Sequence, residues 1–203
     1  MPRSAAMLAV ALVCALHAAC GVPPHAPPQR SSQAASSPAA PTAPTAQAQL
    51  PQHEWLQQLV GEWDVDCEAT MEPGAEPMLL ESTESVRPFG GLWVLAEGEA
   101  TFGGEEFSTM MTLGYDPAQE RFVGTWIDTV QAYMWHYAGT LDETGKVLTL
   151  STRGPSFDDT TDMADYRDAI TVAGPDDRIL TSSVKQDDGT WLTFMRAEYR
   201  RRR

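Results

Sequence analysis

The sequence predicts an all-β protein: an antiparallel up-and-down β-barrel of about ten strands with one short N-terminal helix. Apolar and polar residues alternate with a period of two over most of residues 62–199, as in strands with one buried face. Clusters of glycine, proline and aspartate divide this pattern into short strands joined by tight turns. Ten strands in sequence order avoid long open edges by closing into a barrel. A two-sheet sandwich is the alternative, although its crossover connections are longer than most of these turns.

The predicted helix lies in PQHEWLQQLVG, residues 51–61. Pro51 can open a helix, and Gly61 ends it. We expect His53 to be exposed in the first turn. The helix has one apolar stripe, formed by Trp55, Leu56, Leu59 and Val60.

Ten strands follow the helix in the predicted order. The first is EWDVDCEATM, in which Trp63, Val65 and Cys67 share a face. One long loop spans about residues 153–165. The predicted strands are 62–71, 78–87, 92–102, 106–115, 121–129, 132–140, 146–152, 166–172, 178–185 and 190–199.

Residues 1–50 cannot contribute to the barrel core. All 17 aromatic residues and all 28 acids lie after residue 50. Residues 21–50 are rich in proline, alanine, serine, threonine and glutamine, so we interpret them as a disordered tether. Residues 51–203 are sufficient for a single barrel domain.

Residues 1–20, MPRSAAMLAVALVCALHAAC, have the organisation of a secretory signal peptide. Arg3 precedes an apolar stretch that is too short to span a membrane. The end, LHAAC, resembles a bacterial lipobox with Cys20 as the lipidated residue, although His17 stands where the pattern prefers leucine. Gly21 is not the aspartate associated with inner-membrane retention. The resemblance implies an outer-membrane lipoprotein; the alternative is ordinary cleavage near Ala19 and a periplasmic or secreted protein.

The charge of the folded part excludes one class of partner. Residues 51–203 hold all 28 acids but only 12 of the 14 basic residues, so their net charge is −16. Nucleic-acid binding requires clustered lysine and arginine on the surface, so we do not expect it. The terminal run Arg200 to Arg203 is either a solvated chain end or a contact for an anionic lipid or polymer.

The cysteines indicate no internal disulfide. Cys14 and Cys20 lie in the signal segment, which leaves Cys67 alone in the domain. Its alternation with Trp63 and Val65 predicts a buried strand thiol.

The hairpin LGYDPAQERFVGTWID, residues 113–128, has an aromatic face that also carries a carboxylate. Asp116 and Pro117 suit a type I turn. Asp128 shares a face with Trp126, so it either fixes the polar end of a ligand in the barrel or ends a strand outside. The candidate ligand-binding residues are Trp93, Tyr115, Trp126, Asp128, Tyr133 and Trp135.

Five segments together resemble one bacterial protein family. VGEWDV, PFGGLWV, LGYDPAQERFVGTWID, YAGTLDETGKVLTL and the final EYRRR are similar to the domain-of-unknown-function family number fifteen seventy-nine. The resemblance covers essentially all of residues 51–203. It implies a lipocalin-type, calycin-like β-barrel whose members are often exported, and it brings no established activity.

The resemblance also implies how the barrel closes. Gly61-Glu62-Trp63 is similar to the Gly-x-Trp of lipocalins, in which the tryptophan packs under an arginine from the last strand. Arg196 and Arg200 are the candidates for that arginine in this sequence. The implied cation–π contact would contribute about 0.5–2 kcal/mol.

Catalytic and metal motifs are missing from the sequence. It contains no HExxH, GxSxG, P-loop or CxxC pattern, and we predict no cofactor. The acidic loop FDDTTDMAD, residues 157–165, matches no EF-hand spacing, so we predict no metal site there. His136 lies opposite the face of Tyr133 and Trp135, and we interpret it as a hydrogen-bonded or solvated side chain rather than a ligand or a base.

Three hypotheses for function follow. The first is an exported, lipid-anchored barrel that binds a small, partly apolar ligand, since wide barrels enclose cavities. The second is an envelope scaffold or interaction module with a filled barrel. The third is an enzyme that uses Asp128 and His136 in one cleft.

Overall fold

A computed structural model describes residues 47–70, 75–157 and 162–203. Its helical part is α1 (Pro51–Leu56) followed by the 3-10 turn η1 (Gln57–Leu59). The strands are β1 (Gly61–Ala69), β2 (Met78–Phe89), β3 (Trp93–Phe102), β4 (Glu105–Asp116), β5 (Arg121–Asp128), β6 (Trp135–Leu141), β7 (Val147–Pro155), β8 (Met163–Val172), β9 (Asp177–Lys185) and β10 (Trp191–Arg201). The predicted signal peptide, Cys20 and nearly all of the predicted tether lie outside the described residues. So do Asp158 and Asp159 of the acidic loop.

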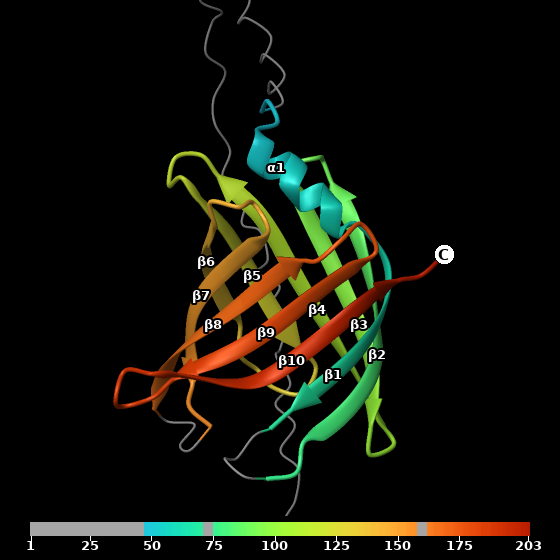
Figure 1. Ribbon diagram of the computed structural model, residues 1–203, viewed down its shortest axis with the longest axis vertical. Coiled ribbons are helices and arrows are strands. Elements are labelled where there is room, and N and C mark those ends of the chain that lie inside the picture. The colour runs from blue at the N-terminus through green and yellow to red at the C-terminus, as the bar shows by residue number, and fades with distance from the viewer. Residues whose placement is uncertain (1–46, 71–74, 158–161) are drawn as a thin grey trace, which may run out of the picture. The chain divides into compact units, whose positions relative to one another are not determined.

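The ten strands form one closed antiparallel barrel in sequence order (Figure 1). Strand β1 closes the ring by pairing with β10, from Trp63 opposite Arg201 to Ala69 opposite Met195. The predicted up-and-down barrel is therefore confirmed. Among the described residues, no helix is both long enough and apolar enough to cross a membrane.

One end of the barrel is filled with close-packed side chains. Helix α1 lies at this end (Figure 1), and its Trp55 and Leu56 are buried together with Leu59 of η1. Burial of each large apolar side chain contributes about 1.5–3 kcal/mol. The strand residues beneath the helix expose 4% or less of their surface: Trp63, Val86, Val94, Leu113, Phe122, Leu148, Leu150 and Ile170.

Two hydrogen bonds hold the helix on the barrel. Trp55 Nε1 donates to the carbonyl of Gly145 at 2.8 Å, in the turn between β6 and β7. His53 is buried rather than exposed, because it faces the end of β4. Its Nδ1 accepts from the Leu50 amide at 2.9 Å, and its Nε2 lies 3.2 Å from the Tyr115 carbonyl. The pattern did not reveal that a histidine in the first turn bridges the helix to a strand.

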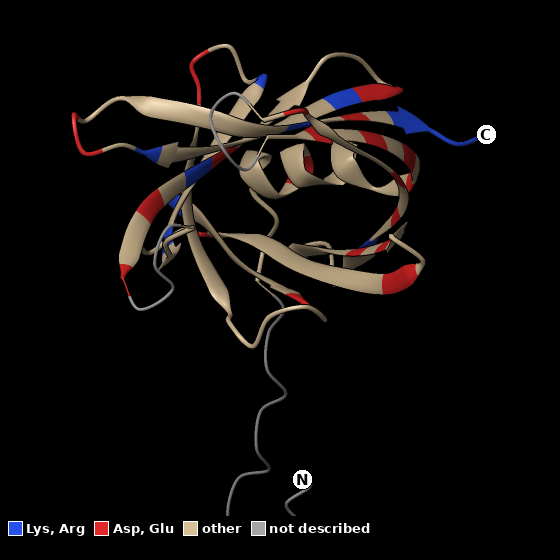
Figure 2. Cartoon of the chain, turned by 90° about the horizontal axis from the view of Figure 1, so that it is seen from below, with Lys and Arg blue, Asp and Glu red and all other residues tan. Residues whose placement is uncertain are grey.

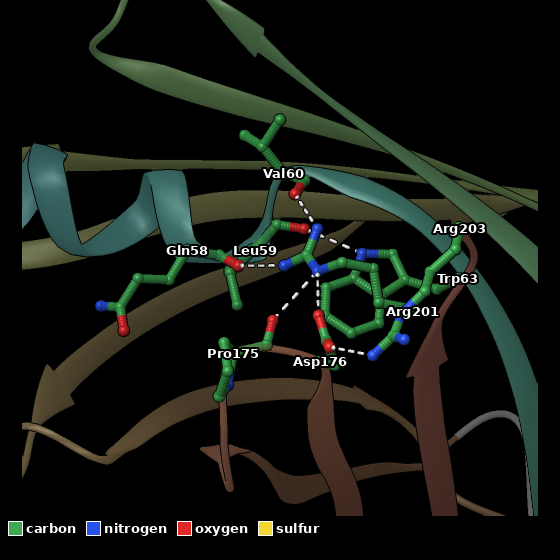
Figure 3. A network of polar contacts seen from close by, with 8 residues as sticks. All are labelled: Gln58, Leu59, Val60, Trp63, Pro175, Asp176, Arg201 and Arg203. Atoms are coloured by element: carbon green, nitrogen blue, oxygen red, sulfur yellow. Dashed lines mark hydrogen bonds and ion pairs between the residues drawn. The ribbon is translucent and has the colours of Figure 1, made fainter.

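The barrel closes around Trp63 (Figure 3). The Arg201 guanidinium lies 4.2 Å from the centroid of the Trp63 ring, and Arg178 of β9 lies 4.6 Å from it. Arg201 also donates to the carbonyls of Val60, Gln58 and Pro175 at 2.6, 3.1 and 3.0 Å. The arginine at the barrel base is thus part of a network that joins η1, β1, β10 and the β8–β9 turn.

The stacking arginine is not one of the two that the sequence suggested. Arg196 pairs with Glu198 and Arg200 pairs with Asp66, and both guanidiniums are about half exposed. The physical reason is strand parity. Ala197 and Tyr199 are buried, so Arg201 shares the inward face and Arg200 points outward.

Candidate functional site

The other end of the barrel is hollow. Figure 2 looks from this end, with α1 lying across the far end. The interior contains two cavities, a first chamber of about 360 Å³ and a second chamber of about 210 Å³. Five residues line both chambers, so the cavities adjoin: Met111, Trp126, Leu180, Phe194 and Met195.

The first chamber is mostly apolar and ends at a buried ion pair. Its wall includes Cys67, Leu80 and Ala96. Glu84 of β2 pairs with Arg178 of β9 across its deep end. Arg178 lies 4.1 Å from the Tyr199 ring centroid, in addition to its contact with Trp63. Its guanidinium is therefore held by one carboxylate and two aromatic rings.

The second chamber is walled by aromatic side chains. Trp126 and Trp135 are directly paired across β5 and β6. Trp135 meets Tyr166 edge-to-face, with ring centroids 5.1 Å apart. Phe157 contacts Tyr166 and Phe194 in the same way, at 5.6 and 4.9 Å. The rings of Trp135, Tyr166, Phe157 and Phe194 form one connected network, in the geometry that aromatic pairs prefer.

One carboxyl group faces the second chamber. Asp168 of β8 accepts a hydrogen bond of 2.6 Å from the Tyr137 hydroxyl, and its carboxyl also bonds with the Ser182 side chain. Burial raises the pKa of Asp168 above its ordinary value, although both hydrogen bonds lower it. Burial, and then the charge of Asp168, raises the pKa of Tyr137. Tyr137 therefore stays a hydrogen-bond donor to this carboxyl.

Further polar groups of the second chamber have no partner. Trp135 Nε1 and Thr152 Oγ1 are buried and form no hydrogen bond within the described part of the chain. A buried polar group without a partner is destabilising. A ligand group that accepts or donates a hydrogen bond would satisfy them.

A β-bulge shapes the wall that the two chambers share. The register of β10 against β9 shifts between Thr193 and Met195. Because of this shift, the neighbours Phe194 and Met195 both line the chambers, although consecutive strand residues normally face opposite sides. Strict alternation could not reveal this arrangement.

The structure places two of the six candidate ligand residues in the chambers, Trp126 and Trp135. Tyr133 lies beside them, since its ring meets Trp135 at 5.2 Å, and its hydroxyl bonds to the Arg153 carbonyl. Tyr115 packs against His53 and Phe122 at the closed end. Trp93 covers Gly114 on the neighbouring strand, where a Cβ would lie 2.3 Å from its ring. Tyr115 and Trp93 do not line either chamber.

Asp128 caps a turn. Its Oδ1 accepts from the backbone amides of Val130 and Gln131 at 2.6 and 2.7 Å, and its Oδ2 accepts from the Gln131 side chain. Neither Asp128 nor His136 lines a chamber, and His136 is exposed. The structure therefore does not bring these two residues together in a cleft. The carboxyl that faces the second chamber belongs to Asp168, which was not among the residues predicted to bind a ligand.

The remaining polar candidates are Cys67 and the arginines at the C-terminus. Cys67 is free and half-buried, and burial raises the pKa of its thiol. The terminal arginines lie at and just after the end of β10 and pair with acids on neighbouring elements: Arg200 with Asp66, Arg202 with Asp64, and Arg203 with Asp176. Among the described residues, no cluster of histidine, cysteine and acids is arranged to hold a metal ion.

Exposed apolar side chains surround the hollow end. Seven of the ten exposed large apolar residues in the described ranges stand on strand ends and loops remote from α1. Phe89 lies at the helix end, and Met110 and Ile127 are paired across β4 and β5. Exposed apolar groups gathered in one region are typical of binding surfaces. The residues are Leu79, Phe102, Val130, Met134, Phe157, Met163 and Leu192.

Comparison with known proteins identifies the family. The family model described as a protein of unknown function, DUF1579, matches residues 48–201. The chain belongs to the DUF1579 family. This confirms the resemblance seen in the sequence, and DUF1579 carries no assigned function. None of the curated proteins matches the chain significantly.

Solved structures are similar to this DUF1579 barrel in fold. The crystal structure of Rv2717c from M. tuberculosis has a TM-score of 0.53 and 15% identity, over 76% of this chain and 99% of that one. A redesigned beta barrel, b11L5F_LGL, has a TM-score of 0.40 and 10% identity, over 75% and 96%. EF1p2_mFAP2b bound to DFHBI has a TM-score of 0.37 and 12% identity, over 74% and 99%. At these identities the likeness extends to the fold alone.

Proposed function

We propose that this DUF1579 protein is an exported, lipid-anchored barrel that binds a small, partly apolar ligand. The observation that carries the proposal is the division of the interior into a packed end and a hollow end. A scaffold needs only a filled barrel. Here the residues beneath α1 are close-packed, while two adjoining chambers of about 360 and 210 Å³ lie beyond them. Ligand pockets are typically about 300–1,000 Å³ and mostly apolar.

The lining supports a ligand with an apolar body and at least one polar group. The shared wall of Met111, Trp126 and Leu180 offers apolar contact to a ligand in either chamber. Asp168 and the unpartnered Trp135 Nε1 offer polar contacts in the second chamber. The exposed apolar side chains around the hollow end favour entry of the ligand from that side.

The cell-envelope location rests on the sequence. The lipobox-like end at Cys20 and the proline-rich segment behind it support a barrel held on a tether at the outer membrane. The stacking of an arginine from β10 on Trp63 after Gly61 supports kinship with lipocalin-type barrels. The alternative function is an envelope interaction module that acts through its outer surface.

A fluorescent apolar probe tests binding in the interior. The probe N-phenyl-1-naphthylamine should bind the purified protein with increased fluorescence and quench its tryptophans. Ala96→Phe fills the wall of the first chamber and should weaken probe binding at least tenfold. Leu95→Phe changes the neighbouring residue, which does not line either chamber, and should leave binding unchanged. Equal binding by both variants would place the probe outside the barrel, and no binding at all would favour the interaction module.

A further inference from the structure

The carboxyl of Asp168 faces the second chamber without a basic partner among the described residues. Its hydrogen bonds come from the hydroxyls of Tyr137 and Ser182, and no lysine, arginine or histidine of the described ranges forms an ion pair with it. Hydroxyl donors orient a carboxylate but do not neutralise it. Buried charges in proteins are normally paired. When Asp168 is ionised, the second chamber is therefore a site of unbalanced negative charge.

The walls around this carboxyl suit a cation. The rings of Trp126, Trp135, Tyr137, Tyr166, Phe157 and Phe194 line the chamber with Asp168. The face of an aromatic ring carries negative charge, and rings arranged as a cage bind ammonium groups, with about 2 kcal/mol or more from a desolvated contact. An apolar body attached to the cation would fill the remaining aromatic and methionine surface.

The same barrel already holds a cation in this way. At the deep end of the first chamber, the Arg178 guanidinium pairs with Glu84 and stacks on Trp63 and Tyr199. The second chamber repeats the carboxylate and the aromatic rings but supplies no cation of its own among the described residues. The protein also has a net charge of −14, which attracts organic cations and repels anions.

The geometry points to the second chamber as a site for organic cations, with Asp168 as their counter-ion. The ligand class is a protonated or quaternary amine on an aromatic or aliphatic body. This inference rests on the proposed function, because it names the chemistry of the ligand that the interior binds. It assigns Trp135 and Tyr166 to the cage and Tyr137 to the orientation of the carboxylate.

A pair of probes that differ only in charge tests the inference. Benzyltrimethylammonium and neopentylbenzene have the same shape, since a carbon atom replaces the quaternary nitrogen. Their affinities for the full-length protein are measured by direct calorimetric titration and by displacement of N-phenyl-1-naphthylamine. The cation should bind at least tenfold more tightly. Asp168→Asn should bring the ratio of the two affinities to about one or below, while binding of neopentylbenzene changes less than threefold.

A matched variant controls for general charge effects. Asp165→Asn removes an exposed acid from the same strand, and the tenfold preference should persist in it. Equal affinities in the wild type, or tighter binding of neopentylbenzene, would overturn the inference and leave the proposed function standing. A preference that survives Asp168→Asn would also overturn it. If neither compound nor the probe binds, the proposed function and the inference both fail.

Discussion

Trp63 and Arg201 lie at opposite ends of the barrel domain in sequence but stack at 4.2 Å where β1 meets β10. Gly61 makes this contact possible. Its φ is +147°, and a Cβ there would lie 2.0 Å from Arg201 Nη1. Arg201 of the last strand therefore joins it to the first strand, and its guanidinium occupies the space that a side chain at residue 61 would need.

Removing this arginine should destabilise the barrel. Arg201→Ala loses the stacking on Trp63 and three hydrogen bonds to carbonyls. We expect the free energy of unfolding to fall by about 1–3 kcal/mol, as measured by urea denaturation. Arg200→Ala is the matched control, because it removes only a solvent-screened surface pair with Asp66 and should leave the free energy of unfolding nearly unchanged. Equal losses of unfolding free energy in the two variants would show that the contacts of Arg201 do not stabilise the closed barrel.

Stability should depend on pH through Asp168. Because burial raises its pKa in the folded protein, the carboxyl contributes stability below its unfolded pKa, where it is protonated in both states. This contribution is lost as the pH rises through the folded pKa. We therefore expect the difference in melting temperature, Asp168→Asn minus wild type, to increase as the pH rises above the ordinary pKa of an aspartate. A difference that stays constant, or that shrinks toward neutral pH, would contradict this.

Cys67 reports on the first chamber. Burial raises the pKa of its thiol, and the side chain lines the cavity. Alkylation by N-ethylmaleimide should therefore be slow in the native protein and fast in denaturant, because the thiolate reacts. Bound N-phenyl-1-naphthylamine should slow alkylation further by occupying the same space. Alkylation that is unaffected by bound probe would place the probe away from Cys67, and mass spectrometry of the intact protein follows the reaction.

Cys20→Ala tests the proposed lipid anchor. In a bacterial host grown with alkyne-labelled palmitate, the wild type should carry the label and sediment with membranes. The variant should lose the label, because the sulfur that bears the lipid is gone. Cys14→Ala lies in the same segment and should leave labelling intact. An unlabelled wild-type protein in the soluble periplasmic fraction would indicate ordinary cleavage instead.

The sequence predicted the barrel well because period-two alternation and turn residues are local signals. All ten strands lie within a few residues of their predicted bounds, and Asp116 caps its turn as expected. The helix is shorter than predicted, since η1 takes over at Gln57. The alternation in β8 also indicates the site, because Tyr166, Asp168 and Ile170 lie on the same face of the strand. Alternation put Asp128 on the same face as Trp126, but it cannot distinguish a barrel interior from a turn at its rim.

The remaining features depend on contacts between distant segments. Pairing of Trp63 with Arg201 rather than Arg200 is decided by which face of β10 turns inward. Exposure of both Phe194 and Met195 to the chambers requires the bulge opposite β9, which no single strand pattern reveals. The division of the interior into a packed end and a hollow end depends on how side chains from ten strands meet, and alternation alone does not determine it.

Native mass spectrometry of the protein, purified gently from a bacterial host, tests most directly whether the hollow end holds a ligand. We expect a reproducible extra mass that belongs to a small organic molecule and is reduced in Ala96→Phe or Asp168→Asn. A ligand-free mass in the wild type, together with no response to apolar or cationic probes, would contradict it. The hollow end would then have no part in binding, and the function would lie on the outer surface.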